Sequence, residues 1–478
     1  MKNVALVASR LAVAGCLLTL AGDAFAIPAF ARKYGTSCLT CHTVYPKLTP
    51  FGEAFRRNGY RFPGVDSDYV KQETVALGQE ANKKTFPSSV WPATLPISAP
   101  ISIGANGQSF WYPDTSASVP RANGGTQFNL DDLVAEAHLW AGASLDDTIT
   151  LWAEVTLASD GVDVEHAQVL FNDLVGSKHA LNLVVGRGFP TLTSFGPHSS
   201  YLGDSLMTVA PVTGIYGLSS DPFTLVDNYN GAEVNGVFAG RFDYSAGVQS
   251  GKNAFSGGLH FNAENVYGHA GFKLGGMRLD GEGSQGPRDA MKPWAEDAVA
   301  VDLFAYHSRE SFDVPGATGT PMGDTSLTLG AAVRAQSGSA ELDLGAYTQR
   351  HDHGAATLDK VTADVEYGEL SYVLFPWMVP ALRLERIGLR PTGGTNVSDV
   401  HLMPGVAFLV RPNVKAVLVA NVEFANGFPT AADGSLLAWD GGNADWGNLV
   451  ASPKDPAAAP STKLKEFQSV ALFLAWAI

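Results

Sequence analysis

Apolar and polar residues alternate along much of the chain after residue 100. Residues 148–157 have the sequence TITLWAEVTL. Every second residue from Ile149 to Leu157 is apolar (Ile, Leu, Ala, Val, Leu), and the residues between them are Thr, Trp, Glu and Thr. Residues 132–143, 414–424 and 469–478 repeat the pattern. Alternation of period two over about ten residues predicts strands with one apolar and one polar face.

About sixteen such strands fit between residue 100 and the end of the chain, and the connections between them alternate in length. Short turns are predicted at SLDD, AGR, SGS, FPW and RPN, and long loops at residues 188–229 and 425–464. An outer-membrane barrel has this rhythm, with short periplasmic turns and long outer loops. Residues 277–298 are long where a short turn is expected, so either the strand count differs there or an excursion lies on the periplasmic side.

A water-soluble β-sandwich or propeller is the alternative fold. No blade repeat is visible, and a sandwich does not readily grow to this length. The apolar faces of the predicted strands also avoid charge, which in lipid costs about 2–4 kcal/mol near the midplane. The composition, with 51 glycines, 10% aromatic residues and 17% charged residues, suits a turn-rich β-protein. No run of residues after the N-terminus is long and apolar enough for a membrane helix. We therefore predict a mainly β fold, a 16-stranded antiparallel barrel over residues 99–478, closed and embedded in outer-membrane lipid.

The first 26 residues resemble an export signal. Lys2 and Arg10 supply positive charge before the apolar core LAVAGCLLTLAG. The AFA sequence that follows fits a cleavage site of small residues. A lipoprotein signal with Cys16 acylated is the alternative, but Arg10 leaves a short apolar stretch before that cysteine. We predict a signal peptide over residues 1–26.

Export and acidity limit the partners. The leader carries Lys2 and Arg10 against Asp23, a net charge of +1, so its removal takes the formal net charge of the chain from −15 to −16. An acidic exported protein is not expected to bind nucleic acid.

The segment GTSCLTCH contains Cys38 and Cys41 followed directly by His42. Two thiols at this spacing can form thioethers to the haem vinyl groups, and the adjacent imidazole can ligate the iron from the same face. A local disulfide is one alternative, and half of a zinc site is another, although no second cysteine pair completes it. Because bacteria attach haem after export, we predict one covalent haem c, with His42 as an iron ligand.

Residues 27–98 are predicted to form a small α-helical haem domain that plugs the barrel. Thr49 can cap a helix that has Pro50 in its first turn and ends at Gly59, with Phe51 and Phe55 on one face. The two phenylalanines can cover a haem or form an ordinary small core. A second helical stretch and a Pro-rich linker follow.

The predicted haem domain lacks an evident sixth iron ligand. Between residues 27 and 100 the only histidine is His42, and there is no methionine. The ligand must then be Lys47, Tyr45 or a residue of the barrel, or the position is open. By strand parity the lumen-facing candidates are His138, His166, His269, His401 and Met403. RHDHG at residues 350–354 is predicted to lie in an outer loop, where it forms a solvated turn or meets a metal ion.

The front of the mature chain resembles the fused monohaem cytochrome–porins, known as outer-membrane iron oxidases. The residues that carry the likeness are Pro28, Phe30, Ala31, Arg32, Cys38, Cys41, His42, Pro46, Leu48, Phe51, Gly52, Phe55, Gly59 and Tyr60. Lys33, Tyr34 and Arg56 depart from the residues usual in iron oxidases, which affects the expected substrate more than the fold. The barrel resembles the family only in architecture and length.

The resemblance implies an electron conduit, with Fe(II):cytochrome c oxidoreductase-like electron transfer. Electrons would pass between an extracellular donor such as Fe(II) and a periplasmic electron-carrier cytochrome, through the haem in the lumen. Electron export, an open-site haem enzyme such as a peroxidase, and a plain diffusion porin are the alternatives. No acid–base pair beside His42 supports the peroxidase.

Overall fold

The structure is a computed structural model. It describes residues 30, 34, 38–44, 47–62, 101–112, 127–129, 136–145, 148–158, 161–176, 178–194, 200–202, 228–250, 263–281, 292–312, 322–352, 360–392, 396–411, 414–428, 462–463 and 466–477. The predicted signal peptide, the second helical stretch and the linker lie outside the described residues. The predicted boundary between residues 98 and 99 also lies outside them.

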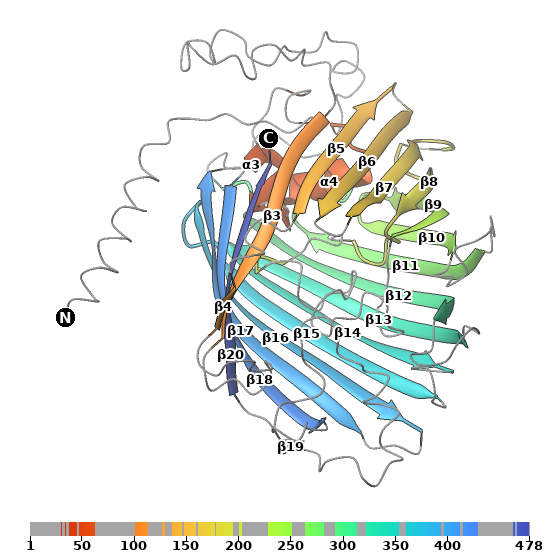
Figure 1. Ribbon diagram of the computed structural model, residues 1–478. Helices are drawn as coiled ribbons and strands as arrows, with labels where there is room; N and C mark the ends of the chain where they lie inside the picture. The colour runs from red at the N-terminus through yellow and green to blue at the C-terminus, as the bar shows by residue number, and fades with distance from the viewer. Residues whose placement is uncertain are drawn as a thin grey trace.

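The described strands from β3 to β20 close into one antiparallel barrel (Figure 1), and β1 (His42–Val44) and β2 (Lys47–Leu48) form a separate two-stranded sheet. The barrel strands are β3 (Ile101–Tyr112), β4 (Gln127–Asn129), β5 (Glu136–Ser144), β6 (Ile149–Ala158), β7 (Gly161–Phe171), β8 (Asn182–Gly188), β9 (Tyr229–Phe238), β10 (Phe242–Ser250), β11 (Ala263–Gly275), β12 (Glu296–Phe312), β13 (Met322–Gly338), β14 (Ala340–His351), β15 (Val361–Tyr372), β16 (Met378–Pro391), β17 (Val397–Arg411), β18 (Val414–Phe428), β19 (Thr462–Lys463) and β20 (Glu466–Ala477). Each strand pairs with the next, and β20 pairs with β3 to close the ring.

The strand number agrees with the prediction. The ring contains eighteen strand segments, but β4 pairs with β3 ahead of β5, and β19 pairs with β18 ahead of β20. These two short segments therefore extend β5 and β20, and the described part of the barrel has sixteen strands.

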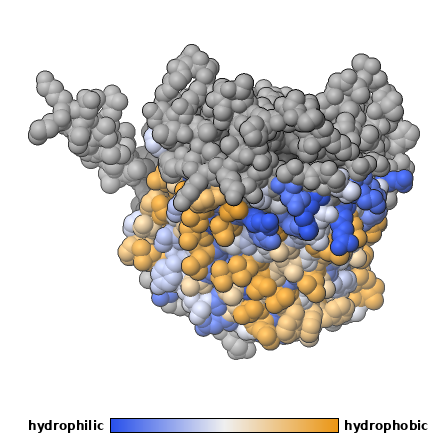
Figure 2. All heavy atoms as spheres, turned by 90° about the horizontal axis from the view of Figure 1, so that it is seen from below, coloured by the Kyte–Doolittle hydropathy of each residue, from blue (hydrophilic) through white to orange (hydrophobic). Residues whose placement is uncertain are grey.

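The polarity of the barrel wall is the reverse of that of a water-soluble protein. On β16, Leu382 and Leu384 are 45% and 50% exposed on the outside, whereas Arg383 and Glu385 between them are buried inside. Strand β6 follows the predicted alternation, with Leu151 exposed and Thr150 buried. Hydrophobic residues cover much of the described surface in Figure 2. An apolar exterior around a polar interior suits lipid outside and water or polar chain inside.

Exposed aromatic side chains gather at the end of the barrel that carries the short turns. They lie at the ends of β9, β15 and β20, at the start of β10 and in the turn between β15 and β16; they are Phe238, Phe242, Tyr372, Phe375, Trp377 and Trp476. Aromatic girdles mark the interfaces of outer-membrane barrels, and their short turns face the periplasm. We therefore refer to this end as the periplasmic end.

The long connections largely follow the sequence prediction. β8 ends at Gly188 and β9 begins at Tyr229, as predicted, whereas β18 continues to Phe428, beyond the predicted start of its loop. Between β11 and β12 the strand count holds, and the described residues of this connection, 276–281 and 292–295, form an excursion at the periplasmic end. Leu279, Asp280 and Trp294 of this excursion are buried.

The described residues between 30 and 62, called the N-terminal segment below, lie inside this ring. They include α3 (Cys38–Cys41), β1 (His42–Val44), β2 (Lys47–Leu48) and α4 (Pro50–Arg57). In Figure 1 these red elements lie at the same end of the barrel as the C-terminus. Among the helices that the structure describes, none has the length and apolar character needed to cross a membrane.

Candidate functional site

The predicted helix after the CxxCH motif is present, with the predicted cap. The Thr49 hydroxyl accepts a hydrogen bond from the Gly52 N–H at 3.1 Å and donates one to the Thr40 carbonyl at 2.8 Å. The Thr49 N–H donates to the Cys41 carbonyl at 2.8 Å. Gly52 is needed at its position because a Cβ there would overlap the Cys41 carbonyl. These contacts fix α4 against the backbone of the motif.

An aromatic cluster fills the space beside α4. Phe55 meets the rings of Phe30 and Tyr34 edge to face at 5.5 and 5.6 Å between centroids. Tyr60 stacks on Phe30 at 5.1 Å and on Trp152 of the barrel wall at 5.4 Å. The cluster joins the N-terminal segment to β6 and provides an apolar, π-rich environment of the kind that covers a porphyrin.

Phe51 and Phe55 lie on one face of α4, as predicted, and both contact Phe62, at 5.0 and 5.9 Å between ring centroids. Both predicted alternatives, a haem cover and a small core, use this face.

A buried ion-pair network anchors the motif to the wall. The Lys47 ammonium pairs with Glu341 and lies 3.6 Å from Asp343, both on β14. Arg334 of β13 binds the same two carboxylates, with its Nε 2.7 Å from Asp343 Oδ1 and 3.7 Å from Glu341 Oε1. Lys47 and Arg334 thus face Glu341 and Asp343, and Glu53 of α4 also lies 3.9 Å from Arg334. Lys47 is only 1% exposed. A lysine whose ammonium group is paired with two carboxylates is not expected to be the sixth iron ligand.

Two further arginines connect α4 and its end to the barrel. Arg57 lies 3.4 Å from Asp243 of β10, and Arg61 lies 2.9 Å from Asp173 in the turn between β7 and β8. Burial raises the pKa of Asp173, but the hydrogen bond from the His179 N–H and the Arg61 guanidinium outweigh it, so the pKa lies below its ordinary value. Asp173 is therefore held in its charged form.

Neutral hydrogen bonds complete the attachment. The Asn58 amide donates to the Asp280 carbonyl at 2.9 Å, so the excursion between β11 and β12 holds the end of α4. Farther round the ring, the Thr150 hydroxyl of β6 donates to the Gly59 carbonyl at 2.8 Å. The N-terminal segment is thus fastened to several sides of the wall at the periplasmic end.

The connection after β8 also runs along the inner wall. Thr191 donates to Glu233 of β9, Ser194 to Asp302 of β12, and Ser200 to Glu369 of β15. The Tyr201 N–H also donates to Glu369 at 2.8 Å. The described residues of this connection therefore follow the inner wall from β9 to β15.

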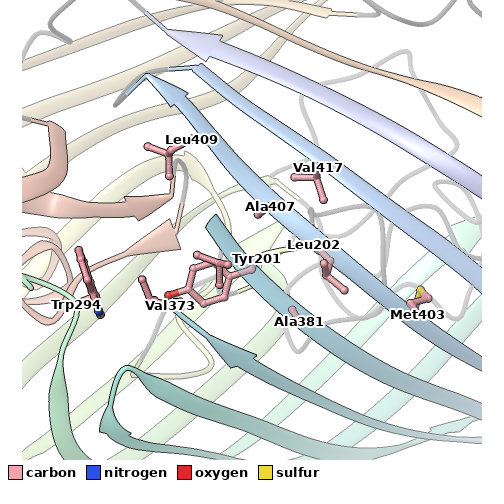
Figure 3. Packing of buried hydrophobic residues seen from close by; sticks show 10 residues of the cluster. Tyr201, Leu202, Trp294, Val373, Ala381, Met403, Ala407, Leu409 and Val417 are labelled. Carbon is pink, nitrogen blue, oxygen red and sulfur yellow. The ribbon is translucent and has the colours of Figure 1, made fainter. Parts of the chain in front are cut away.

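Tyr201 joins this connection to the motif. Lys47 Nζ lies 4.5 Å from the centre of its ring, and burial raises the pKa of its phenol well above the ordinary value. Tyr201 and Leu202 belong to a buried apolar cluster with Met403, Ala407 and Leu409 of β17 and other residues (Figure 3). Tyr201, Leu202 and Met403 are thereby buried, at 3%, 2% and 1% exposed.

The CxxCH residues have a donor set that fits a c-type haem. α3 places Cys38 and Cys41 one turn apart, and His42 follows directly as the first residue of β1. Cys41 is a half-buried thiol and His42 is half-buried. Two cysteines followed directly by a histidine are the residue types that covalent haem attachment requires. The bound group itself stays a prediction.

The five barrel residues predicted to face the lumen do so. His138, His269, His401 and Met403 are 7%, 6%, 1% and 1% exposed, and the imidazole of His166 is close to Glu154 inside the wall. His138 is hydrogen-bonded through both ring nitrogens, to Asn106 and Thr156. Met403 packs in the apolar cluster, at the opposite end from Leu409 in Figure 3. Which residue completes the iron coordination remains a prediction, and Tyr45 lies outside the described residues.

The RHDHG segment differs in part from its prediction as a loop. Arg350 and His351 are the last residues of β14, and His351 is 2% exposed. The strand continues because Arg350 and His351 pair with Thr362 and Val361 of β15. Asp352 lies beyond the strand and pairs with Lys360 at 3.4 Å on the surface, while His353 lies outside the described residues.

Sequence reasoning missed the residues that bind the N-terminal segment to the wall. Lys47 was considered only as an iron ligand, and Arg57, Arg61, Asp243 and Asp173 were not singled out. Their signal in the sequence is weak, since charges on the polar face of a strand are expected as lumen lining whether or not they have a partner.

The topology and the exterior decide the broad class. A closed ring of sixteen antiparallel strands with an apolar outer face and buried charges inside is a membrane-spanning barrel. The chain forms an outer-membrane barrel of the porin type.

Comparison with known proteins agrees with this class without refining it. The chain matches no protein-family model and no curated protein. It is similar to OmpT, an outer membrane protein of Vibrio cholerae, at 13% identity over 79% of this chain and 96% of that chain, with a TM-score of 0.46. It is also similar to an anion-selective porin from Comamonas acidovorans, at 12% identity over 79% and 98%, TM-score 0.45. The outer membrane channel DcaP of Acinetobacter baumannii gives 9% identity over 79% and 96%, TM-score 0.42. At these scores the assignment rests on the barrel's own topology and surface.

Proposed function

We propose that this porin-type barrel is an electron conduit of the outer membrane. One haem c on Cys38, Cys41 and His42 would carry electrons between extracellular Fe(II) and a periplasmic electron-carrier cytochrome. The observation that carries the proposal is that the CxxCH segment is built into the lumen, with Lys47, Arg57 and Arg61 each paired to a carboxylate of the wall or its turns. A haem supplies reversible one-electron chemistry at a potential set by its ligands and burial.

The residues around the motif suit this task because they fix its position and exclude water. The Thr49 cap and the close contact at Gly52 set α4 against Cys41. The aromatic cluster and the apolar cluster around Tyr201 and Met403 line the neighbouring space. A dry, rigid site keeps a redox group at one depth and limits reorganisation around it.

Placement at the periplasmic end favours a periplasmic partner. α4 is held by Asp173 and Asp280, which both lie in connections at that end. A soluble cytochrome could approach there without entering the barrel, while the extracellular donor would reach the site through the lumen. The formal net charge of −16 after removal of the leader (−15 − 1) favours attraction of Fe(II) over an anionic donor.

The test uses the full mature protein, purified and reconstituted in vesicles that enclose oxidised cytochrome c. Fe(II) added outside is expected to reduce first the haem of the barrel and then the enclosed cytochrome, both followed by their absorption bands. The matched control is the Cys38→Ala, Cys41→Ala double variant, which keeps the barrel but lacks the thioethers. Absence of covalent haem in the parent, or haem that Fe(II) does not reduce, would overturn the proposal.

A further inference from the structure

Three neighbouring strands bring two aspartates together over a glycine. In the antiparallel register Asp243 of β10 lies opposite Gly271 of β11, and Gly271 lies opposite Asp302 of β12. All three residues are on the inner face of the wall, and a Cβ on Gly271 would overlap both carboxylates. The missing side chain therefore lets the two carboxylates approach each other across an intervening strand.

His269 completes the group, from the same face of β11. Its Nε2 lies 2.8 Å from Asp302 Oδ1, and one ligand atom from each of His269, Asp243 and Asp302 falls within 4.8 Å of the others. The side chains of His269 and Asp302 are 0% exposed, and that of Asp243 is 6% exposed. Two carboxylates that converge away from water repel each other unless a cation lies between them.

One oxygen of the group lacks a partner. Asp243 Oδ1 is buried, and no hydrogen-bond donor reaches it among the residues that the structure describes. Its other oxygen, Oδ2, is the one that lies 3.4 Å from Arg57 Nε. A buried carboxylate oxygen without a donor costs free energy, so its position beside His269 and Asp302 points to a bound cation.

The remaining contacts fix the orientation of the two carboxylates, as hydrogen bonds to the ligands of a metal ion do. The Ser194 N–H donates to Asp302 Oδ1 at 2.9 Å, and its hydroxyl donates to Asp302 Oδ2 at 2.9 Å. Arg57 holds Asp243 in the same manner. Among the described residues, Arg57 is the one arginine in an ion pair with either of these two carboxylates, so the group has room for positive charge. Outer-shell contacts of this kind fix the direction in which a ligand points.

We propose that Asp243, His269 and Asp302 form a site for a divalent first-row transition-metal cation inside the lumen. Imidazole together with carboxylate suits Fe(II), Mn(II) or Zn(II) better than Ca²⁺ or Mg²⁺, which prefer oxygen ligands alone. The site lies beside α4, since Arg57 contacts Asp243, and all three ligands face the lumen, from which a cation would enter. The proposal does not depend on the haem.

A second group of similar residues lacks these features. His138, Glu154 and Glu165 also offer three ligand atoms close together. Both ring nitrogens of His138 are hydrogen-bonded, to Asn106 at 2.8 Å and to Thr156 at 3.0 Å. Hydrogen bonding accounts for that group, and His138 serves as a control in the experiment below.

The experiment measures zinc, so that haem iron does not interfere. Tag-free protein with its haem is treated with a chelator, incubated with Zn(II), passed through a desalting column and analysed for zinc by mass spectrometry. The parent is expected to retain one zinc more per chain than His269→Ala. The same loss is expected for Gly271→Ala, because its methyl group would separate the carboxylates.

Matched controls distinguish the site from general damage. In Gly268→Ala the added Cβ meets only the Ser245 carbonyl, at 3.6 Å, so this variant and His138→Ala are expected to retain as much zinc as the parent. Ser194→Ala is expected to bind zinc about 10–100-fold more weakly. Heat-dependent gel mobility confirms that each barrel is folded, and His269→Ala remains decisive if Gly271→Ala does not fold.

Equal zinc in the parent and His269→Ala would overturn the proposal and leave a hydrogen-bonded histidine–aspartate pair. This outcome is distinct from failure of the conduit, which is read from haem attachment and Fe(II) reduction.

Discussion

Lys47 and Glu341 form a buried ion pair although 294 positions separate them in the chain. The lysine is the first residue of β2, shortly after the CxxCH motif, and the glutamate is the second residue of β14. This pair places the motif against the inner wall, and it is shared with Asp343 and Arg334. The N-terminal segment is therefore bound to the barrel by charge as well as by packing.

Lys47→Met is expected to weaken the docking of the N-terminal segment. Two buried carboxylates would then share Arg334 alone, and breaking a buried pair in this way costs about 3 kcal/mol. The population of the undocked segment should rise about 100-fold. The rate at which a protease cleaves the segment in folded, detergent-solubilised protein measures this population.

Lys360→Met is the control for that change. Lys360 pairs with Asp352 at 3.4 Å, with both side chains more than half exposed, and such pairs contribute little. Cleavage of Lys47→Met at the rate of the control would show that the ion pair does not hold the segment.

Asp173→Asn is expected to lower the thermal midpoint at neutral pH but not in acid. The folded-state pKa of Asp173 lies below its ordinary value of 3.8, since the His179 N–H and Arg61 outweigh the effect of burial. The charged form therefore contributes stability that is fully present above about pH 3.8 and is lost as the pH falls through the folded-state pKa. Midpoints of parent and variant, measured from pH 7 downwards, should converge in acid.

Asp163→Asn provides the comparison, because Asp163 is 66% exposed and lies 3.7 Å from Arg187. Its effect at neutral pH should be the smaller of the two. A midpoint difference for Asp173→Asn that stays constant into acid would contradict the role given to the charged carboxylate.

Gly52→Ala is expected to separate α4 from the CxxCH backbone. The added methyl group would overlap the Cys41 carbonyl, which cannot move away without disturbing α3. Overpacking of this kind costs about 1–3 kcal/mol. Faster proteolysis of the N-terminal segment is the expected result, whereas Gly161→Ala, whose Cβ meets nothing within 4 Å, should behave like the parent.

Met403→Ala is expected to destabilise the barrel and leave the haem spectrum unchanged. Met403 is 1% exposed and packs in the apolar cluster with Leu202 and Val417, so its truncation leaves a cavity that costs about 2–5 kcal/mol. Met403→Leu should restore most of the stability. A shift in the visible bands of both variants would instead identify Met403 as the sixth iron ligand.

The barrel could be predicted from the sequence because its signal is local. Alternation in segments such as residues 148–157 identifies both faces of a strand without knowledge of its neighbours. The loop at residues 188–229 and the helix capped by Thr49 were predicted for the same reason, since turn and cap preferences depend on adjacent residues.

The interior could not be predicted in the same way, because its contacts join residues far apart in the chain. The pairing of Arg57 with Asp243 depends on which strand faces α4, and the group of Asp243, His269 and Asp302 depends on the register of three strands. Of that group only His269 was singled out, from its parity. His351 was predicted to lie in an outer loop from the expected strand topology, whereas pairing with β15 extends the strand through it.

The attachment points of the N-terminal segment bear on how the barrel is assembled. The segment precedes β3, yet it contacts β6, β10 and β14, and the ring closes only when β20 pairs with β3. No partly built sheet that lacks β14 can seat the segment fully, and a finished cylinder leaves it only an end opening as an entrance. Final docking of the front end therefore waits until β14 has joined the sheet, which couples maturation of that front end to the later steps of barrel folding.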